Sequence, residues 1–197
     1  KNLNHAPLLK KELGLEETDK IVTTIGPFKP QKNLPDFIKT ANIVFKKDPS
    51  FKFIITGDGD ERPKLERLIA TYGLENRVIL LGWRRDISNI LNSSDFFAMT
   101  SLWEGLPIST IEAMACGLVP VVNDVDGQRE IVKDGVNGFL VNPYDAEDTA
   151  AKILFLAKNP EIKDKMSSNA KQTIDETFGI DYMIKQHENL YRELTGF

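Results

Sequence analysis

Six short apolar runs, rich in β-branched and aromatic residues, recur along the chain and are typical of buried β-strands. Gly, Asp or Pro residues punctuate their ends, and the runs occupy residues 21–25, 51–56, 78–81, 96–99, 119–122 and 139–141. Apolar residues follow one another within the runs instead of alternating with polar ones, which predicts strands that are covered on both faces.

Helix-length segments separate these runs. Over residues 34–46, apolar side chains recur at the three- and four-residue spacing of an amphipathic helix. Similar patterns predict helices over 62–72, 86–91, 108–115, 127–132, 146–158, 160–176 and 180–195. Strands that alternate with helices form parallel sheets with right-handed crossovers. The sequence therefore predicts a Rossmann-like, three-layer α/β/α fold with a parallel sheet of about six strands, followed by C-terminal helices.

The chain is expected to contain one main domain with extra elements at each end. Residues 20–175 are predicted to form the α/β domain, and residues 176–197 a C-terminal helix. Residues 1–19 have the pattern of a linker and a short amphipathic helix that continue from a preceding domain. Because the first residue is not Met, we interpret the chain as a piece of a longer protein.

Composition narrows the classes of partner. A net charge of −4 and a pI of about 5.3 argue against broad electrostatic binding of nucleic acid or anionic lipid, although a local cationic pocket for phosphate remains compatible. The single cysteine, Cys116, rules out an intramolecular disulfide, fits a reducing compartment and is interpreted as a small core residue. No apolar run reaches the ~20 residues that cross a bilayer.

The strongest candidate for chemistry is the segment 100–107 and the helix that follows it, because ligands bind at the carboxyl ends of parallel strands. Pro107 is expected at the first helical position, where the helix N-terminus offers an anion site suited to a diphosphate. Glu112, roughly 7–8 Å into the helix, could accept hydrogen bonds from a ribose, and Glu104 could reach a sugar. Spacing alone favours two ordinary solvated carboxylates, since such a pair is common by chance.

Two further loops follow the first two strands. In residues 26–33, Lys29 and Lys32 could meet phosphate oxygens as point charges, or could simply be exposed to solvent. Gly57 and Gly59 permit backbone conformations that let a ligand or a neighbouring loop approach closely, although the GDG string could also form only a tight turn.

The loop after the third strand carries Gly82, Trp83 and Arg84, which could flank a base or a phosphate. Alternatively, Trp83 packs against the protein and Asp86 caps the next helix. Neither the GxGxxG fingerprint of dinucleotide-binding proteins nor a GxxxxGK[ST] phosphate loop is present, which disfavours a simple Rossmann dehydrogenase.

Taken in order, several strings resemble the C-terminal, donor-binding domain of the GT4 glycosyltransferases (glycosyl transferase group 1, GT-B fold). They are GPFKPQKN, GDGDERPKLE, VILLGWRRDI, SDFFAMTSLWEGLPISTIEAMACGLVPVV and EIVKDGVNGFLVNPYDAEDTA, and they cover about residues 20–155. The spacing from Glu104 to Glu112 matches the E-x7-E motif of that family. The resemblance implies one half of a GT-B enzyme that moves a sugar from a UDP- or GDP-sugar to a glycan or lipid-linked acceptor. It implies transfer with retention of configuration, no metal or other cofactor, and an acceptor bound by an N-terminal domain outside this chain.

The resemblance also implies residue roles. Glu104 would lie near the reacting centre, Lys32 would neutralise the leaving diphosphate, and these two are the predicted catalytic residues. The predicted donor-binding residues are Gly26, Lys29, Gly57, Gly59, Gly82, Trp83, Arg84, Gly105, Leu106, Pro107, Ile108 and Glu112. Glu112 would hold the ribose hydroxyls.

The chain departs from the family pattern at Pro27, where the family usually has an arginine that pairs with the diphosphate. We expect Lys29 or Arg84 to substitute for it. This departure keeps open a degenerate nucleotide-sugar-binding module, and another GT-B enzyme such as an epimerase is a second alternative. Where the family has paired glycines, the chain has Asp126 and Gly127.

The following acidic position, Glu130, is interpreted as structural. Alone, the chain is expected to bind nucleotide weakly and to transfer sugar negligibly. The resemblance implies a cytoplasmic protein and leaves open peripheral attachment to the inner face of a membrane.

Overall fold

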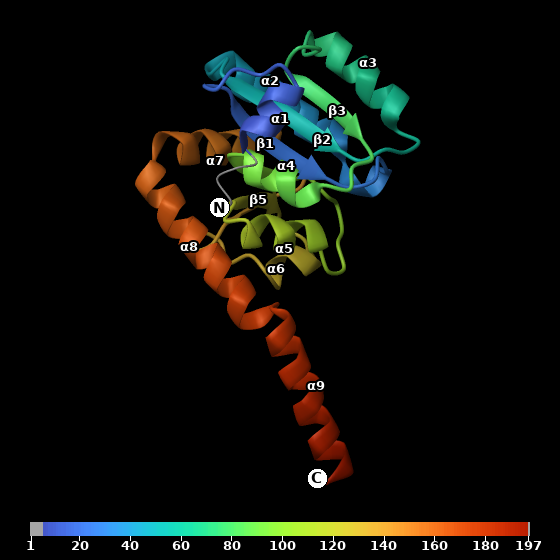
Figure 1. The fold of residues 1–197 in the computed structure, drawn as a ribbon. Coiled ribbons are helices and arrows are strands. Elements are labelled where there is room, and N and C mark those ends of the chain that lie inside the picture. Colours follow the sequence, from blue (N-terminus) through green and yellow to red (C-terminus); the bar gives the residue numbers. More distant parts are fainter. Residues whose placement is uncertain (1–5, 197) are drawn as a thin grey trace.

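The six predicted strands form one sheet in the computed structural model, which describes residues 6–196 (Figure 1). All neighbours are parallel and lie in the order β3-β2-β1-β4-β5-β6. The strands are β1 (Lys20–Ile25), β2 (Phe51–Thr56), β3 (Val78–Gly82), β4 (Phe96–Met99), β5 (Pro120–Asn123) and β6 (Phe139–Val141). The Rossmann-like fold predicted from the apolar runs is confirmed.

Helices connect the strands and complete the chain. They are α1 (Ala6–Glu12), α2 (Leu34–Lys47), α3 (Arg62–Tyr72), α4 (Ile87–Ser93), α5 (Ile108–Ala115), α6 (Asp126–Arg129), α7 (Ala146–Lys158), α8 (Pro160–Thr177) and α9 (Ile180–Thr195), with a 3-10 turn η1 (Pro30–Lys32). The helix predicted over 127–132 is shorter than expected. It ends at Arg129, and the residues that follow it form a turn.

Helices cover both faces of the sheet, as expected for strands without polar alternation. On one face, Val22, Phe53 and Ala98 belong to a core cluster with residues of α2, α3 and α7. On the opposite face, Phe97 packs with residues of α4, α5 and α8, and Ile54 packs with Leu9 of α1. Neighbouring residues along a strand therefore face different helix layers, which explains why the runs are apolar throughout.

The strand order creates a switch point between β1 and β4. The chain leaves β1, adds β2 and β3 on one side, and returns to place β4 on the other side of β1. The loop after β1 leads to α2 on one face, whereas the loop after β4 leads to α5 on the other face. The two loops separate at the carboxyl edge of the sheet, which is where open α/β sheets bind ligands.

The helices at the two ends of the chain differ in how they pack on the domain. Helix α1 is docked on the domain, because Leu9 is buried against Ile21, Ile54 and Ile90. Residues 1–5 of the predicted linker lie outside the described residues. Helix α9 extends away from the body (Figure 1), and its side chains are exposed.

Helix α8 runs to Thr177, two residues beyond the border expected at 175. Within residues 6–196, no helix combines the length and the apolarity that a membrane span requires.

Candidate functional site

Backbone and side-chain hydrogen bonds join the loops after β1 and β4 at the switch point. The amide of Leu102 donates to the Gln31 carbonyl at 2.8 Å, and Gln31 Nε2 donates to the Trp103 carbonyl at 2.8 Å. Thr100 Oγ1 donates to the carbonyls of Lys32 and Asn33 at 3.1 and 3.0 Å. These contacts fix the segment before Glu104 against the segment that carries Lys32. The sequence pattern had not singled out Gln31.

The two predicted catalytic residues are in direct contact. Lys32 Nζ donates to Glu104 Oε1 at 2.6 Å, although the residues are 72 positions apart. Their side chains are only 13% and 7% exposed, so the ion pair is largely removed from water. The Lys32 side chain lies across Gly26, where an added Cβ would come within 2.9 Å of Lys32 Cε. Removal of one partner from a charge pair this well buried leaves the other charge uncompensated and destabilises the fold.

Glycines allow the loops after β1 and β2 to touch. A Cβ at Gly57 would lie 2.0 Å from the Gly26 carbonyl oxygen, and one at Gly59 would lie 2.7 Å from the Phe28 carbonyl oxygen. The φ angles of Gly57 and Gly59, 133° and 157°, are ones that other residues rarely adopt. The structure shows the close approach of a neighbouring loop that these glycines allow. The Gly57 amide also donates to the Gly82 carbonyl at 2.9 Å.

The loop after β5 supports Glu104 from the other side. Asn123 Nδ2 donates to the carbonyls of Thr100 and Ser101 at 2.9 and 3.1 Å, and the Gly127 amide donates to the Glu104 carbonyl at 3.2 Å. A Cβ at Gly127 would lie 1.8 Å from the Gly105 carbonyl oxygen. Sequence reasoning missed Asn123 as a positioning residue, and the only signal for Gly127 was its place in the family glycine pair.

Helix α5 has the predicted bounds, but Pro107 precedes the helix and is not its first helical residue as expected. Pro107 is the N-cap with φ −78° and ψ 84°, and the first helical residue is Ile108. The amides of Gly105, Leu106 and Ser109 donate no hydrogen bond to any of the described residues. Unpaired amides at a helix start, together with the positive end of the helix dipole, form a site that favours an anion. Leu106 and Ile108 are both exposed beside them.

Glu112 is solvent-accessible on α5, where its carboxylate makes no hydrogen bond or ion pair with the described residues. Partial burial by the surrounding protein nevertheless raises the pKa of Glu112 above its usual range. Because no described residue bonds to them, the carboxylate oxygens of Glu112 are available to accept hydrogen bonds from hydroxyl groups.

Arg84, in the loop after β3, forms ion pairs that the sequence did not predict. Arg84 donates to both oxygens of Asp86 at 2.8 Å and also pairs with Glu12 of α1. These carboxylates raise the pKa of Arg84, and Arg84 in turn lowers the pKa of Asp86. Trp83 is 73% exposed, and Lys29 is exposed without a side-chain partner within residues 6–196. Lys29 therefore carries the less compensated charge of the two candidates to replace an arginine at position 27.

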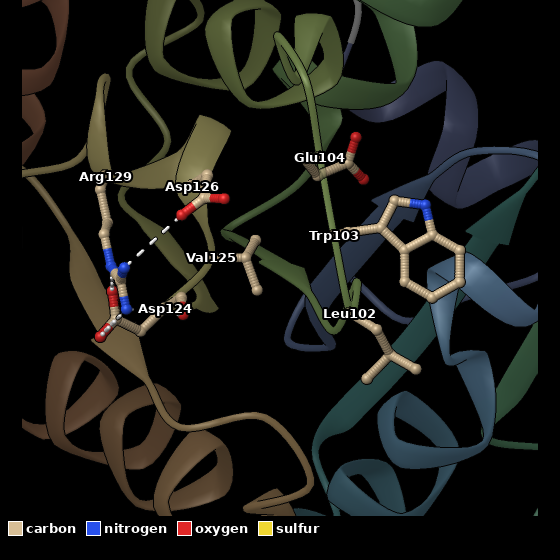
Figure 2. A pocket seen from close by; sticks show the side chains of 7 residues that line it. All are labelled: Leu102, Trp103, Glu104, Asp124, Val125, Asp126 and Arg129. Atoms are coloured by element: carbon tan, nitrogen blue, oxygen red, sulfur yellow. Dashed lines mark hydrogen bonds and ion pairs between the residues drawn. The ribbon is translucent and has the colours of Figure 1, made fainter.

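A pocket of about 220 Å³ adjoins Glu104 (Figure 2), lined by Leu102, Trp103, Glu104, Asp124, Val125, Asp126 and Arg129. Arg129 Nε donates to Asp124 Oδ1 at 2.6 Å on the side of the pocket opposite Glu104. Sequence reasoning did not predict Asp124 or Arg129 there. The part of the chain that the structure describes holds no group of three or more His, Cys, Asp or Glu side chains placed to bind a metal ion.

The fold and the edge at which the loops meet are those of an open, Rossmann-like α/β domain. Residues 6–173 match the model of the family described as glycosyl transferases group 1, and the chain belongs to this family.

Curated relatives agree with this assignment. The chain is 33% identical over 195 residues to the UDP-Gal:alpha-D-GlcNAc-diphosphoundecaprenol alpha-1,3-galactosyltransferase of Escherichia coli, covering 98% of this chain and 50% of that protein. It is 30% identical to the N-acetyl-alpha-D-glucosaminyl L-malate synthase of Bacillus anthracis, covering 94% of this chain and 49% of that protein. The chain thus spans about half the length of these relatives.

Solved structures show the same fold. HepE of Anabaena, in complex with UDP and glucose, superimposes with a TM-score of 0.89 at 26% identity, covering 100% of this chain and 53% of that one. A TarM variant of Staphylococcus aureus, in complex with fondaparinux, alpha-GlcNAc-glycerol and UDP, gives a TM-score of 0.83 at 31% identity. The superposition covers 88% of this chain and 36% of the TarM chain.

Proposed function

We propose that this chain is the donor-binding half of a retaining glycosyltransferase that takes a sugar from a UDP-sugar. The observation that carries the proposal is the buried ion pair between Lys32 and Glu104, placed where the loops after β1 and β4 diverge and next to the unpaired amides before α5. Membership of the group 1 family supports it, and so does UDP in the structures of HepE and TarM.

In the proposed arrangement the diphosphate lies at the start of α5. The amides of Gly105, Leu106 and Ser109 donate to its oxygens, Lys32 balances its charge, and Glu112 accepts the hydroxyls of the ribose. When the bond to the sugar breaks, negative charge grows on the leaving diphosphate, and donors that are already oriented stabilise it. We propose that these protein groups supply the positive charge without a metal cofactor. Activity of the whole transferase that survives EDTA and is lost in Lys32→Met would support this, and activity restored only by a divalent cation would refute it.

The acceptor is proposed to be a glycan or a lipid-linked saccharide bound by the other half of the protein. The Escherichia coli relative is named for a diphosphoundecaprenol-linked acceptor, and TarM was solved with alpha-GlcNAc-glycerol. The chain alone, spanning about half of its curated relatives, is proposed to bind donor and to turn over negligibly. Acceptor-dependent release of UDP by the isolated chain would contradict this part.

A thermal-shift comparison of UDP, GDP, ADP and their sugars tests the donor site. A ligand that binds only the folded state at 100 times its Kd stabilises it by about 2.7 kcal/mol. For a chain of this size that corresponds to a rise in Tm of roughly 5–10 °C, which we expect for UDP and UDP-sugars. Glu112→Gln should weaken UDP binding, whereas Glu161→Gln, an exposed change on α8, should not. If no nucleotide shifts the Tm of the folded chain, the proposal is wrong.

Retention of configuration is tested on the whole transferase. Proton NMR of the first product formed from an α-linked UDP-sugar should show an α-linkage. A β-linked first product would rule out a retaining mechanism.

A further inference from the structure

A guanidinium that is not among the predicted site residues lies where the loops after β1, β2 and β3 meet. Arg62 is the first residue of α3, and its Nε donates to Asp58 Oδ1 of the β2 loop at 2.8 Å. Its Cζ lies 5.3 Å from the centre of the Phe28 ring, in the β1 loop. A Cβ at Gly82, the last residue of β3, would lie 3.8 Å from Arg62 Nη2. One planar cation therefore contacts the loops after β1 and β2 and lies beside the last residue of β3.

Most of the donors of this guanidinium have no acceptor among residues 6–196. Nη1 reaches Glu66 Oε1 only at 3.4 Å, and Nη2 donates no hydrogen bond to any residue that the structure describes. A guanidinium offers five N–H donors in a rigid fork, so the group retains capacity for a ligand. Arg84, in contrast, is already paired with carboxylates on two sides.

The position of Arg62 along the sheet edge indicates which part of a nucleotide it would meet. In the proposed function, which this inference assumes, the diphosphate lies at α5 after β4, and Arg62 lies beside β3, two strands beyond β1. A nucleotide extended from α5 along this edge would bring its base toward Gly82. A base offers carbonyl oxygens to N–H donors and a ring face to a planar cation.

We propose that Arg62 contacts the nucleobase of the bound donor. The guanidinium lies over the Phe28 ring, and the absence of a side chain at Gly82 leaves Nη2 open. The rival explanation is purely structural: Arg62 covers the buried Phe28 ring and pairs with Asp58. That role would change the stability of the domain and leave its affinity for nucleosides unchanged.

The test uses NMR titrations of the 197-residue chain with uridine, UMP, UDP and inorganic pyrophosphate. Arg62→Met should weaken uridine, UMP and UDP by a similar factor, roughly tenfold, and leave pyrophosphate binding unchanged. Arg62→Lys, which can keep an ion pair with Asp58, guards against loss of the fold and should weaken the same three ligands severalfold. Arg67→Met is the matched control, because Arg67 lies exposed on the same helix without a side-chain hydrogen bond or ion pair among the described residues.

Each outcome separates the explanations. Wild-type affinities in both Arg62 variants, with only a lower Tm, would overturn the base contact and leave the proposed function standing. Weaker UDP and pyrophosphate binding with unchanged uridine binding would place Arg62 on the phosphates and would also overturn it. A folded wild-type chain that binds none of the four ligands would refute the proposed function and the base contact together.

Discussion

Replacing Gly127 by alanine should displace the loop that carries Glu104. The added Cβ would lie 1.8 Å from the Gly105 carbonyl oxygen, 2.7 Å from its carbonyl carbon and 2.8 Å from the Glu104 carbonyl oxygen. All three atoms belong to the backbone, so no flexible side chain can rotate away. Restoring a separation of about 3 Å requires a movement of more than an ångström between α6 and this loop.

The size of the effect follows from that movement. Overpacking of a filled site costs typically 1–3 kcal/mol, and a backbone collision belongs at the upper end of that range. About 3 kcal/mol corresponds to a fall in Tm of roughly 6–12 °C for a chain of this length. The same displacement should lengthen the 2.6 Å contact between Lys32 and Glu104 and weaken UDP binding.

Differential scanning calorimetry and UDP titration of Gly127→Ala measure both effects. Gly105→Ala is the matched control for stability, because a Cβ there meets no atom within 4 Å. Its Tm should stay within about 2 °C of the wild type, as expected for a surface substitution. If Gly127→Ala matches the wild type in both Tm and UDP affinity, the steric argument for this glycine is refuted.

Three further predictions concern the surroundings of the site. Lys32→Met should destabilise the fold by about 3 kcal/mol, because it leaves Glu104 buried without its partner, and the added Glu104→Gln change should recover most of the loss in thermal unfolding. Asn123→Ala should cost about 2 kcal/mol in urea unfolding, since two buried carbonyls lose their donor; a cost below 0.5 kcal/mol would count against that role. Hydrogen bonds from Lys20 and from Ser50 lower the pKa of Asp48 to about 2, so the stabilisation by the Asp48 carboxylate is present above pH 4 and disappears as the pH falls toward 2. Because the side chains of Lys20 and Asp48 are both about a third exposed, we expect this stabilisation to be only about 1 kcal/mol. It is measured as the difference in unfolding free energy between wild type and Asp48→Asn, which should disappear over this pH range.

Secondary structure and fold could be predicted because they depend on patterns that are local in sequence. The run 96–99 is apolar at every position, and all four residues are buried in the strand. The Glu104-to-Glu112 spacing placed one carboxylate before a helix and the other within it, and the structure has this arrangement.

Contacts between loops could not be predicted from spacing, because they depend on which strands are neighbours. Gly127 meets Gly105 only because β5 lies beside β4, and Lys32 meets Glu104 only because β4 returns to the side of β1. Arg84 was predicted to lie near a ligand, and its ion pair with Glu12 was not predicted. Glu12 lies 72 residues earlier, on helix α1, which docks on the same edge of the domain. A sequence pattern does not contain this proximity.

The contact between Lys32 and Glu104 has a consequence for the proposed donor site. Because the Lys32 ammonium is already paired with a carboxylate, a diphosphate that binds as proposed has to compete with Glu104 and gains only the difference between the two attractions. In the proposed transfer, the same carboxylate can pair with the lysine again as the nucleotide leaves. An exchange of this kind would keep the nucleotide from binding too tightly and would favour repeated cycles over a single firm capture.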